Sequence, residues 1–160
     1  NPKKISIIYR NYSKNNNINE IIHLNKYCKN RQFKFYLANN FKLAWKLNLD
    51  GAYIPAFNKC LKHKLYTIKR DFLIIGSSHN ATEIRYKIKQ GCKKIFLSPI
   101  FRVSKKKNYL GLFNFRNLIS KSKIEIVALG GINEFNIKKL KISGCSGFAS
   151  ISHIKKTAQK

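Results

Sequence analysis

The chain has 160 residues, 44% of them hydrophobic, which is enough for one domain with a sizeable core. Its formal net charge is +27, with 33 Lys and Arg residues against only 6 Asp and Glu. No apolar run is long enough to span a bilayer and no signal-peptide pattern is present, so we expect a cytoplasmic protein without a membrane segment.

The positive charge alone does not predict a nucleic-acid-binding protein. Most of the basic residues are Lys, and they are spread along the whole sequence. Neither a zinc-finger spacing nor an RNA-binding aromatic motif accompanies them. We therefore expect a solvated basic surface that attracts anionic substrates, with nucleic acid not the main partner.

Apolar runs alternate with helical patterns in the order expected of a parallel α/β fold. The runs predict seven strands, at residues 5–9, 34–37, 52–54, 72–75, 94–97, 125–129 and 147–150. The patterns between them predict helices at residues 18–29, 41–47, 81–90, 113–121 and 134–142. The strands are almost continuously hydrophobic, as strands buried on both faces are.

Two helix starts carry capping signals. Asn80 with Glu83 forms a capping pair ahead of the third helix, and Asn133 can cap the last helix. The four cysteines, Cys28, Cys60, Cys92 and Cys145, are far apart in sequence. We expect them to be buried or half-buried, with no disulfide and no zinc site.

The pair Gly130-Gly131 follows the sixth apolar run directly. Glycines at the end of a strand let backbone N–H groups approach an anion, and (β/α)8 barrels place a phosphate site after strands seven and eight. The pair could instead relieve a crowded turn. An open doubly wound sheet could hold the same elements, but the glycine placement favours the barrel.

The predicted fold is therefore a (β/α)8 TIM barrel that lacks its first β/α unit, forming a single domain over residues 1–160. The sequence begins with Asn1 and contains no Met, from which we expect a fragment or processed chain. A barrel without one strand leaves two edges unpaired. We expect the missing unit to exist in the natural protein, or another element to cover the gap.

Four segments at successive strand ends resemble the thiamine phosphate synthase / TenI (thiazole tautomerase) family. They are Leu73 to Asn80 (LIIGSSHN), Leu97 to Phe101 (LSPIF), Val127 to Ile132 (VALGGI) and Gly147 to Ser152 (GFASIS). The synthase joins a pyrimidine diphosphate to a thiazole phosphate and releases pyrophosphate. The resemblance implies a thiamine-biosynthesis transferase with these two small-molecule substrates, Mg²⁺ as cofactor, and an ability to form homo-oligomers.

The resemblance also implies roles for individual residues. Gly130, Gly131, Ile151 and Ser152 match positions that hold the thiazole phosphate. On the diphosphate side, Arg10 and Ser78 match contacts to the diphosphate, and Lys106 matches the lysine that neutralises the leaving pyrophosphate. Other interpretations stay open: Arg10 could pair with a carboxylate, Lys106 could belong to a solvated basic loop, and Ser78 and Ser152 could be helix N-caps.

The sequence departs from the synthase pattern where that pattern binds the metal. The two expected aspartates are replaced by Asn39 and Asn58. Neutral amides bind Mg²⁺ less well than carboxylates. The thiazole tautomerase branch lacks the same aspartates and needs a proton shuttle, for which His79 is the candidate. His79 could also simply precede the helix at Asn80.

Three hypotheses follow. The first is a thiamine phosphate synthase in which Lys106 and Arg10 are the catalytic candidates. The second is a metal-free thiazole tautomerase in which His79 is the catalytic candidate. The third is a degenerate, non-catalytic barrel that binds a phosphorylated compound or nucleic acid.

Overall fold

A computed structural model describes residues 5–12, 17–104 and 108–150. Seven parallel strands form one sheet in the order of the chain. The strands are β1 Ser6–Tyr9, β2 Lys34–Ala38, β3 Gly51–Ile54, β4 Leu73–Ser78, β5 Lys94–Leu97, β6 Glu125–Leu129 and β7 Gly147–Ala149. The connections hold α-helices α1 Ile18–Asn30, α2 Phe41–Lys46, α3 Ala81–Lys89 and α4 Gly111–Ser120, and 3₁₀ helices η2 Lys62–Leu65 and η3 Ile137–Ile142.

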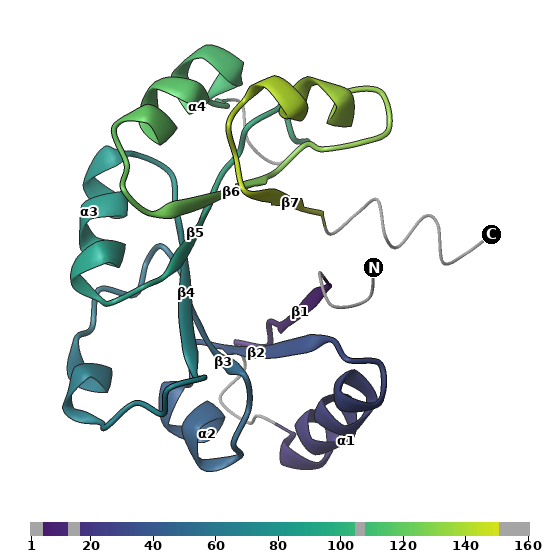
Figure 1. Ribbon diagram of the computed structural model, residues 1–160, viewed down its shortest axis with the longest axis vertical. Coiled ribbons are helices and arrows are strands. Elements are labelled where there is room, and N and C mark those ends of the chain that lie inside the picture. The colour runs from purple at the N-terminus through teal and green to yellow at the C-terminus, as the bar shows by residue number, and fades with distance from the viewer. Residues whose placement is uncertain (1–4, 13–16, 105–107, 151–160) are drawn as a thin grey trace.

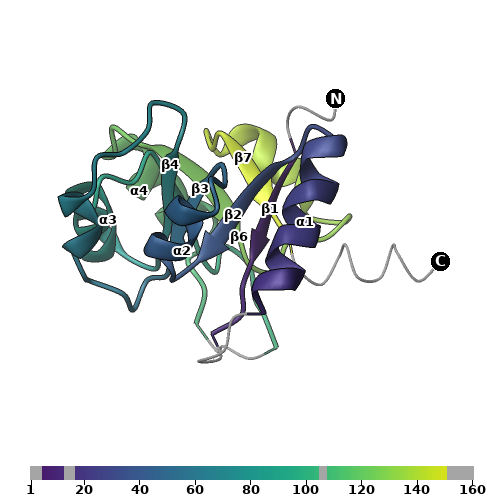
Figure 2. The ribbon, with the colours of Figure 1, turned by 90° about the horizontal axis from the view of Figure 1, so that it is seen from below.

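The sheet is strongly curved, and the α-helices cover its convex outer face (Figure 1). Strands β1 and β7 form the two edges of this sheet and lie on the same side of the molecule (Figures 1 and 2). The consecutive strand order and the helices on one face exclude the doubly wound sheet, which reverses its strand order and has helices on both faces. The curved parallel sheet agrees with the predicted barrel architecture.

Both faces of the sheet are buried, but by different groups. The larger core lies between the strands and the helices and includes Phe35, Leu37, Ile95 and Phe115. A smaller cluster lines the concave face and consists of Tyr36, Ala38, Tyr53, Ile75, Phe96 and Val127. Two buried faces explain why the strands read as continuous apolar runs rather than as an alternating pattern.

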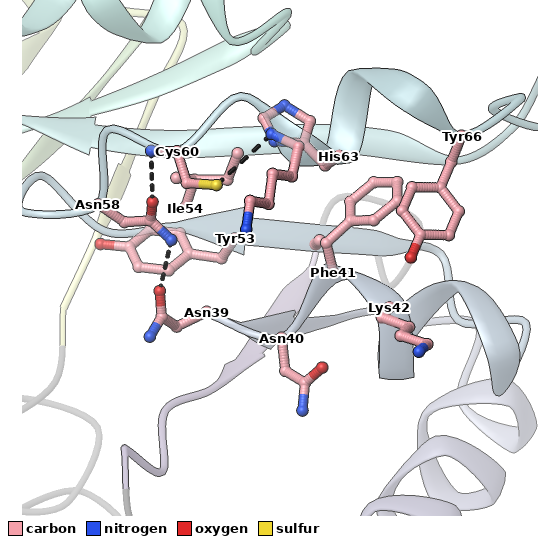
Figure 3. Close-up of a pocket in the computed structure, with 12 residues that line it drawn as sticks. Asn39, Asn40, Phe41, Lys42, Tyr53, Ile54, Asn58, Cys60, His63 and Tyr66 are labelled. Atoms are coloured by element: carbon pink, nitrogen blue, oxygen red, sulfur yellow. Dashed lines mark hydrogen bonds between the residues drawn. The ribbon is translucent and has the colours of Figure 1, made fainter.

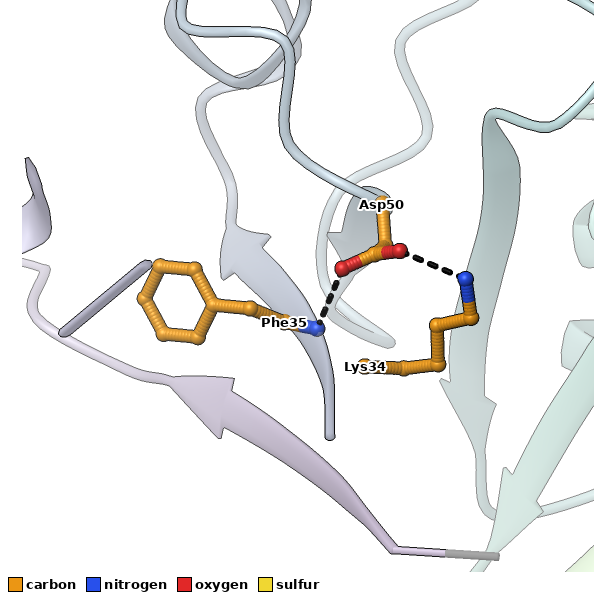
Figure 4. Close-up of polar contacts among 3 residues, drawn as sticks. All are labelled: Lys34, Phe35 and Asp50. Atoms are coloured by element: carbon orange, nitrogen blue, oxygen red, sulfur yellow. Dashed lines mark hydrogen bonds and ion pairs between the residues drawn. The ribbon is translucent and has the colours of Figure 1, made fainter. Parts of the chain in front are cut away.

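Acidic residues gather at the amino ends of the strands. The Asp50 carboxylate accepts hydrogen bonds from Lys34 Nζ at 2.7 Å and from the Phe35 backbone N–H at 2.9 Å (Figure 4). Lys94 and Glu125 form a second ion pair between the first residues of β5 and β6, at 2.8 Å. These pairs tie neighbouring strands together at the end of the sheet opposite the carboxyl ends.

All seven predicted strands are present, and those at 94–97 and 125–129 have the predicted bounds. The helix predicted at 134–142 is present only in part, as a 3₁₀ helix that begins at Ile137 and ends at Ile142. Asn133 accepts hydrogen bonds from the N–H groups of Phe135 and Asn136, and this local turn competes with a helical start. Helix η2 was not predicted.

The predicted burial of the cysteines is confirmed for three of the four. All four cysteines are unpaired; Cys28 and Cys92 are buried and Cys145 is half-buried. Cys60 is exposed, which the prediction of burial did not anticipate, because it lies in the long loop after β3 rather than on a helix. Within the described part of the chain, no helix is both long and apolar enough to cross a membrane.

Candidate active site

The carboxyl ends of the parallel strands meet at one end of the curved sheet, where barrel enzymes place their chemistry. Side chains alternate between the two faces of a strand, so the concave cluster identifies which ones point inward. Ile75 and Phe96 belong to that cluster, and Ser77 and Ser98 follow them by two residues each. Ser77 and Ser98 therefore face the mouth of the concave side.

Arg10 lies at the end of β1 beside two tyrosine rings. Its guanidinium carbon is 5.5 Å from the centre of the Tyr12 ring and 5.9 Å from that of Tyr53. Its Nε donates to the Tyr12 hydroxyl at 3.1 Å, and Tyr12 in turn meets Phe57 edge to face at 5.7 Å. No carboxylate of the described residues pairs with this exposed cation. The aromatic rings thus orient the Arg10 guanidinium, and its positive charge is available to an anionic ligand.

The two adjacent serines of β4 differ in what they face. Ser77 Oγ accepts a hydrogen bond from the Ala56 backbone N–H at 3.0 Å and so ties β4 to the loop after β3. Ser78 is fully buried on the other face of the strand, and its hydroxyl has no hydrogen-bond partner. Ser78 is not a helix N-cap, because Asn80 caps α3 by accepting from the Glu83 N–H at 2.9 Å. Strand alternation could have identified Ser77 as the inward-facing serine.

His79 follows β4 directly and is held from both sides. Its ring Nδ1 lies 2.6 Å from the carbonyl oxygen of Ser98, at the end of β5. A carbonyl can only accept, so Nδ1 carries the proton and, in the neutral ring, Nε2 has the lone pair. The backbone N–H of His79 donates to the Glu83 carboxylate at 2.7 Å. This fixed orientation leaves Nε2 able to accept and return a proton.

Asn39, just after β2, meets Asn58, in the loop that follows β3. Asn58 Nδ2 donates to Asn39 Oδ1 at 2.7 Å (Figure 3). The two residues line one side of a pocket of about 240 Å³. Four rings, those of Phe41, Tyr53, His63 and Tyr66, line the same pocket. The sequence prediction that these two amides share a site is therefore consistent with their positions.

The pair does not fit Mg²⁺. Asn58 Oδ1 already accepts from the Cys60 backbone N–H at 2.8 Å, and Asn39 Oδ1 accepts from Asn58. Mg²⁺ sites in proteins rely on carboxylates, and no Asp or Glu lines this pocket. Among the described residues, no group of three or more His, Cys, Asp or Glu could hold a metal ion.

A buried lysine holds the loop that carries Asn58. Lys87, on α3, is 1% exposed, and its Nζ donates to the carbonyl oxygens of Pro55 at 2.6 Å and Asn58 at 2.8 Å. Gln90 accepts from Lys87 Nζ at 2.8 Å and donates to the carbonyl oxygens of Asn58 and Cys60 at 3.0 and 2.8 Å. We call this pair the Lys87–Gln90 clamp. Sequence reasoning missed it, although Lys87 lies three residues after the buried Ile84 on the same helix face.

Burial lowers the pKa of Lys87 to about 8, and the nearby Cys92 and Glu83 oppose this shift. Lys87 therefore remains mostly charged at neutral pH. Burial also raises the pKa of the adjacent Cys92 thiol to about 12, which keeps that residue in the thiol form. The clamp thus places one positive charge directly beneath the loop after β3.

The glycine pair packs against the loop after β5. Gly130 has φ of 92° and Gly131 has φ of 71°, a region that residues with a Cβ rarely adopt. A Cβ on Gly131 would lie 2.6 Å from the Arg102 carbonyl oxygen, and one on Gly130 would lie 2.8 Å from Pro99. The crowded-turn interpretation therefore has direct support, while the phosphate-binding role of the pair stays a prediction.

Three predicted site residues, Lys106, Ile151 and Ser152, lie outside the described residues. Arg10, Asn39, Asn58, Ser77 and His79 do lie at the carboxyl ends of their strands or in the loops that follow. Their arrangement offers donors and a cation to an anionic ligand, and one imidazole nitrogen to a proton.

The chain as a whole is similar to known proteins. The family model described as thiamine monophosphate synthase matches residues 4–154. A thiamine-phosphate synthase of Prochlorococcus marinus subsp. pastoris is 30% identical over 153 residues, which cover 92% of this chain and 44% of that protein. A thiamine-phosphate synthase of Fusobacterium nucleatum is 25% identical, with 95% of this chain and 75% of that protein covered. The chain thus spans less than half the length of the Prochlorococcus relative.

A solved structure has a similar fold. Thiamine phosphate pyrophosphorylase from Pyrococcus furiosus superposes with a TM-score of 0.73 at 20% identity, covering 91% of this chain and 71% of that one. A 3-hexulose-6-phosphate synthase superposes with a TM-score of 0.64 at 12% identity, covering 91% and 77% of the two chains. These two likenesses concern the barrel-like fold alone.

Proposed function

The chain belongs to the thiamine monophosphate synthase family, and we propose that the protein couples a hydroxymethylpyrimidine diphosphate to a thiazole phosphate in thiamine biosynthesis. In this transferase reaction the C–O bond to the diphosphate breaks, the thiazole nitrogen supplies the electron pair for the new C–N bond, and pyrophosphate leaves. The observation that carries the proposal is the family match over nearly the whole chain, together with Arg10 at the carboxyl end of β1, which forms no ion pair with a carboxylate of the described residues.

We also propose which strands of a complete (β/α)8 barrel the seven strands of this chain correspond to. Barrels of this kind hold phosphate after strands seven and eight, and Gly130-Gly131 follows β6. In this assignment β6 and β7 take the places of strands seven and eight, and β1 takes the place of the second strand. The end of β1 then contributes Arg10 to the diphosphate half of the site, opposite the glycine pair.

The protein's own residues have two tasks in this reaction. Arg10 attracts the diphosphate and stabilises the negative charge that grows on it as the C–O bond breaks. The glycine turn and the residues after β7 hold the thiazole phosphate so that its ring nitrogen faces the reacting carbon. Lys106 is proposed as a second cation for the leaving group. Because the amide pair lacks carboxylates, no step is assigned to a metal ion.

A second candidate function rests on His79. Its Nδ1 is fixed against the Ser98 carbonyl oxygen, which leaves Nε2 as a base at the mouth of the sheet. An oriented imidazole of this kind suits the tautomerase reaction, in which a proton must move between two positions of a thiazole carboxylate phosphate. The synthase reaction requires no such base.

Two parallel assays of the purified protein test the proposal. One supplies the pyrimidine diphosphate with the thiazole phosphate and measures the coupled product by mass spectrometry. The other supplies the thiazole carboxylate phosphate in deuterated water and measures isomerisation and deuterium uptake. We expect product in the first assay. Isomerisation without coupling would instead support the tautomerase, and inactivity in both would support a binding protein.

A substitution at His79 separates the two reactions further. His79→Asn keeps a side-chain N–H that can donate to Ser98, but it removes the imidazole base. We expect coupling to change by less than about tenfold, because orientation is kept, whereas loss of general base catalysis costs about 10²–10⁴-fold. A coupling rate reduced by three orders of magnitude would contradict the assignment of His79 as a residue outside the synthase chemistry.

A further inference from the structure

The orientation of the Asn39–Asn58 amide pair determines which atoms it offers to a ligand. The Cys60 backbone N–H can only donate, so the Asn58 atom that it contacts at 2.8 Å must be the carbonyl oxygen Oδ1. Asn58 Nδ2 is then the donor toward Asn39, whose Oδ1 lies 2.7 Å away. Asn39 Nδ2 is left pointing away from Asn58 (Figure 3). The outward atom of the pair is therefore an N–H donor.

The Lys87–Gln90 clamp holds the backbone of the loop on which this orientation depends. It binds the backbone carbonyl oxygens on both sides of the loop turn that carries Asn58 and Cys60. Because the Lys87 ammonium has only carbonyl and amide oxygens as hydrogen-bond partners, no carboxylate within ion-pair distance neutralises it. A divalent cation beside Asn58 would be repelled by this charge, and an anion would be attracted.

The residues that line the surrounding pocket also favour an anion over a cation. Lys42 and Lys62 contribute to its lining, and none of its lining residues is acidic. Its volume of about 240 Å³ suits a small group such as a phosphate rather than a whole drug-sized ligand. The orientation of the two amides, the buried charge of Lys87 and the basic pocket lining therefore all favour an anionic ligand.

We propose that the Asn39–Asn58 pair is an oxyanion site, which receives a phosphate oxygen through Asn39 Nδ2 and takes the place of a divalent-cation site. Within the proposed function, on which this assignment of the ligand rests, the oxyanion is the diphosphate of the pyrimidine substrate. Lys87 and Gln90 are positioning residues: they hold the loop and supply positive charge without contacting the ligand.

Calorimetric titration of the purified protein with inorganic pyrophosphate tests the site without any turnover. With EDTA present we expect pyrophosphate to bind, and added Mg²⁺ to change its affinity by less than about threefold once the Mg²⁺–pyrophosphate complex is accounted for. Binding only in the presence of Mg²⁺ would overturn the proposal. So would binding of Mn²⁺ alone at this pair, detected by electron paramagnetic resonance and abolished by Asn39→Gly.

Asn39→Gly is the sharpest variant, because Asn39 has φ of 59° and glycine accepts this conformation without strain. Loss of one hydrogen bond to a charged group should weaken pyrophosphate binding about tenfold or more. Asn48→Gly is the matched control, since Asn48 is also an exposed asparagine, with φ of 51°, outside this pocket. Equal affinities in the two variants would overturn the proposal.

The outcomes also separate this inference from the proposed function. Metal-independent pyrophosphate binding that depends on Asn39, in a protein that forms no coupled product, would leave the oxyanion site in place and remove the synthase reaction. Coupling that proceeds only with Mg²⁺, in a protein whose pyrophosphate binding is insensitive to Asn39→Gly, would support the synthase reaction and overturn the oxyanion site.

Discussion

Lys87 Nζ, on the third α-helix, donates to the backbone carbonyl oxygen of Asn58 at 2.8 Å, although the two residues are 29 positions apart. The contact links a helix on the outer face of the sheet to a loop at its mouth. The amide of Asn58 continues the link to Asn39 at the end of β2. A buried cation and two amides therefore occupy the region where the family pattern has carboxylates.

Lys87→Met should weaken pyrophosphate binding and reduce stability. The variant leaves the Pro55 carbonyl oxygen and Gln90 Oε1 without their donor and removes one of the two donors to the Asn58 carbonyl oxygen, which we expect to lower the free energy of unfolding by about 1–3 kcal/mol. Calorimetry and urea unfolding check both effects. Lys89→Met, an exposed lysine of the same helix, is the control. Lys87→Arg should restore part of the binding; an affinity unchanged in Lys87→Met would show that the clamp does not act on the site.

The stability contributed by Lys87 should rise with pH above 8. Its pKa is about 8 in the folded protein against 10.5 ordinarily, so between these values the unfolded state binds more protons. The free energy of unfolding then increases with pH, by at most about 1.4 kcal/mol per pH unit. Urea unfolding of the wild type and Lys87→Met at pH 7 to 10 measures this. Cys92, whose pKa is also shifted, is present in both proteins. If the difference in the free energy of unfolding between the two proteins stays constant above pH 8, the effect of burial on the pKa of Lys87 is contradicted.

Gly131→Ala should destabilise the protein by about 1–3 kcal/mol, because an added Cβ combines an unfavourable φ with a contact of 2.6 Å to the Arg102 carbonyl oxygen. Gly147→Ala is the control, since no atom lies within 4 Å of a Cβ at that position. Thermal unfolding of the two variants gives the comparison. Similar melting temperatures would mean that the glycine turn is not held against the loop after β5.

Arg10→Lys should raise the KM for the pyrimidine diphosphate about tenfold while the KM for the thiazole phosphate stays within about twofold. Lysine keeps the charge but loses the planar fork that stacks on Tyr12 and Tyr53 and can bind two phosphate oxygens. Steady-state kinetics with each substrate varied in turn provides the measurement. An equal change in both KM values would place Arg10 outside the diphosphate half of the site.

The strands were predictable because their apolar runs are bounded by charged or glycine residues, as at Lys94–Leu97 and Glu125–Leu129. The sequence prediction ended β4 at residue 75, but the strand continues to Ser78 because Ser77 and Ser78 pair with Phe96 and Leu97 of the next strand. Polar residues at a site can extend a strand when the neighbouring strand supplies the ladder. Hydrophobicity alone gives no signal for this extension.

The site could be predicted only in part. Motif positions identified Arg10, Asn39, Asn58 and His79, all of which lie at or just beyond the carboxyl ends of strands. The Lys87–Gln90 clamp was not predictable, because its partners are backbone carbonyl groups about 30 residues away and every residue type has one. Nor could the sequence show which amide atom of Asn39 points away from Asn58, since this depends on the N–H of Cys60.

Coupled product formation in the presence of EDTA is the most direct test of metal-independent coupling by this protein. The purified protein is given the pyrimidine diphosphate and the thiazole phosphate, and the coupled product and released pyrophosphate are quantified together, with and without Mg²⁺. We expect equal amounts of product and pyrophosphate under both conditions. No coupled product under either condition would contradict the proposed reaction, and product formed only with Mg²⁺ would contradict the oxyanion site at Asn39 and Asn58.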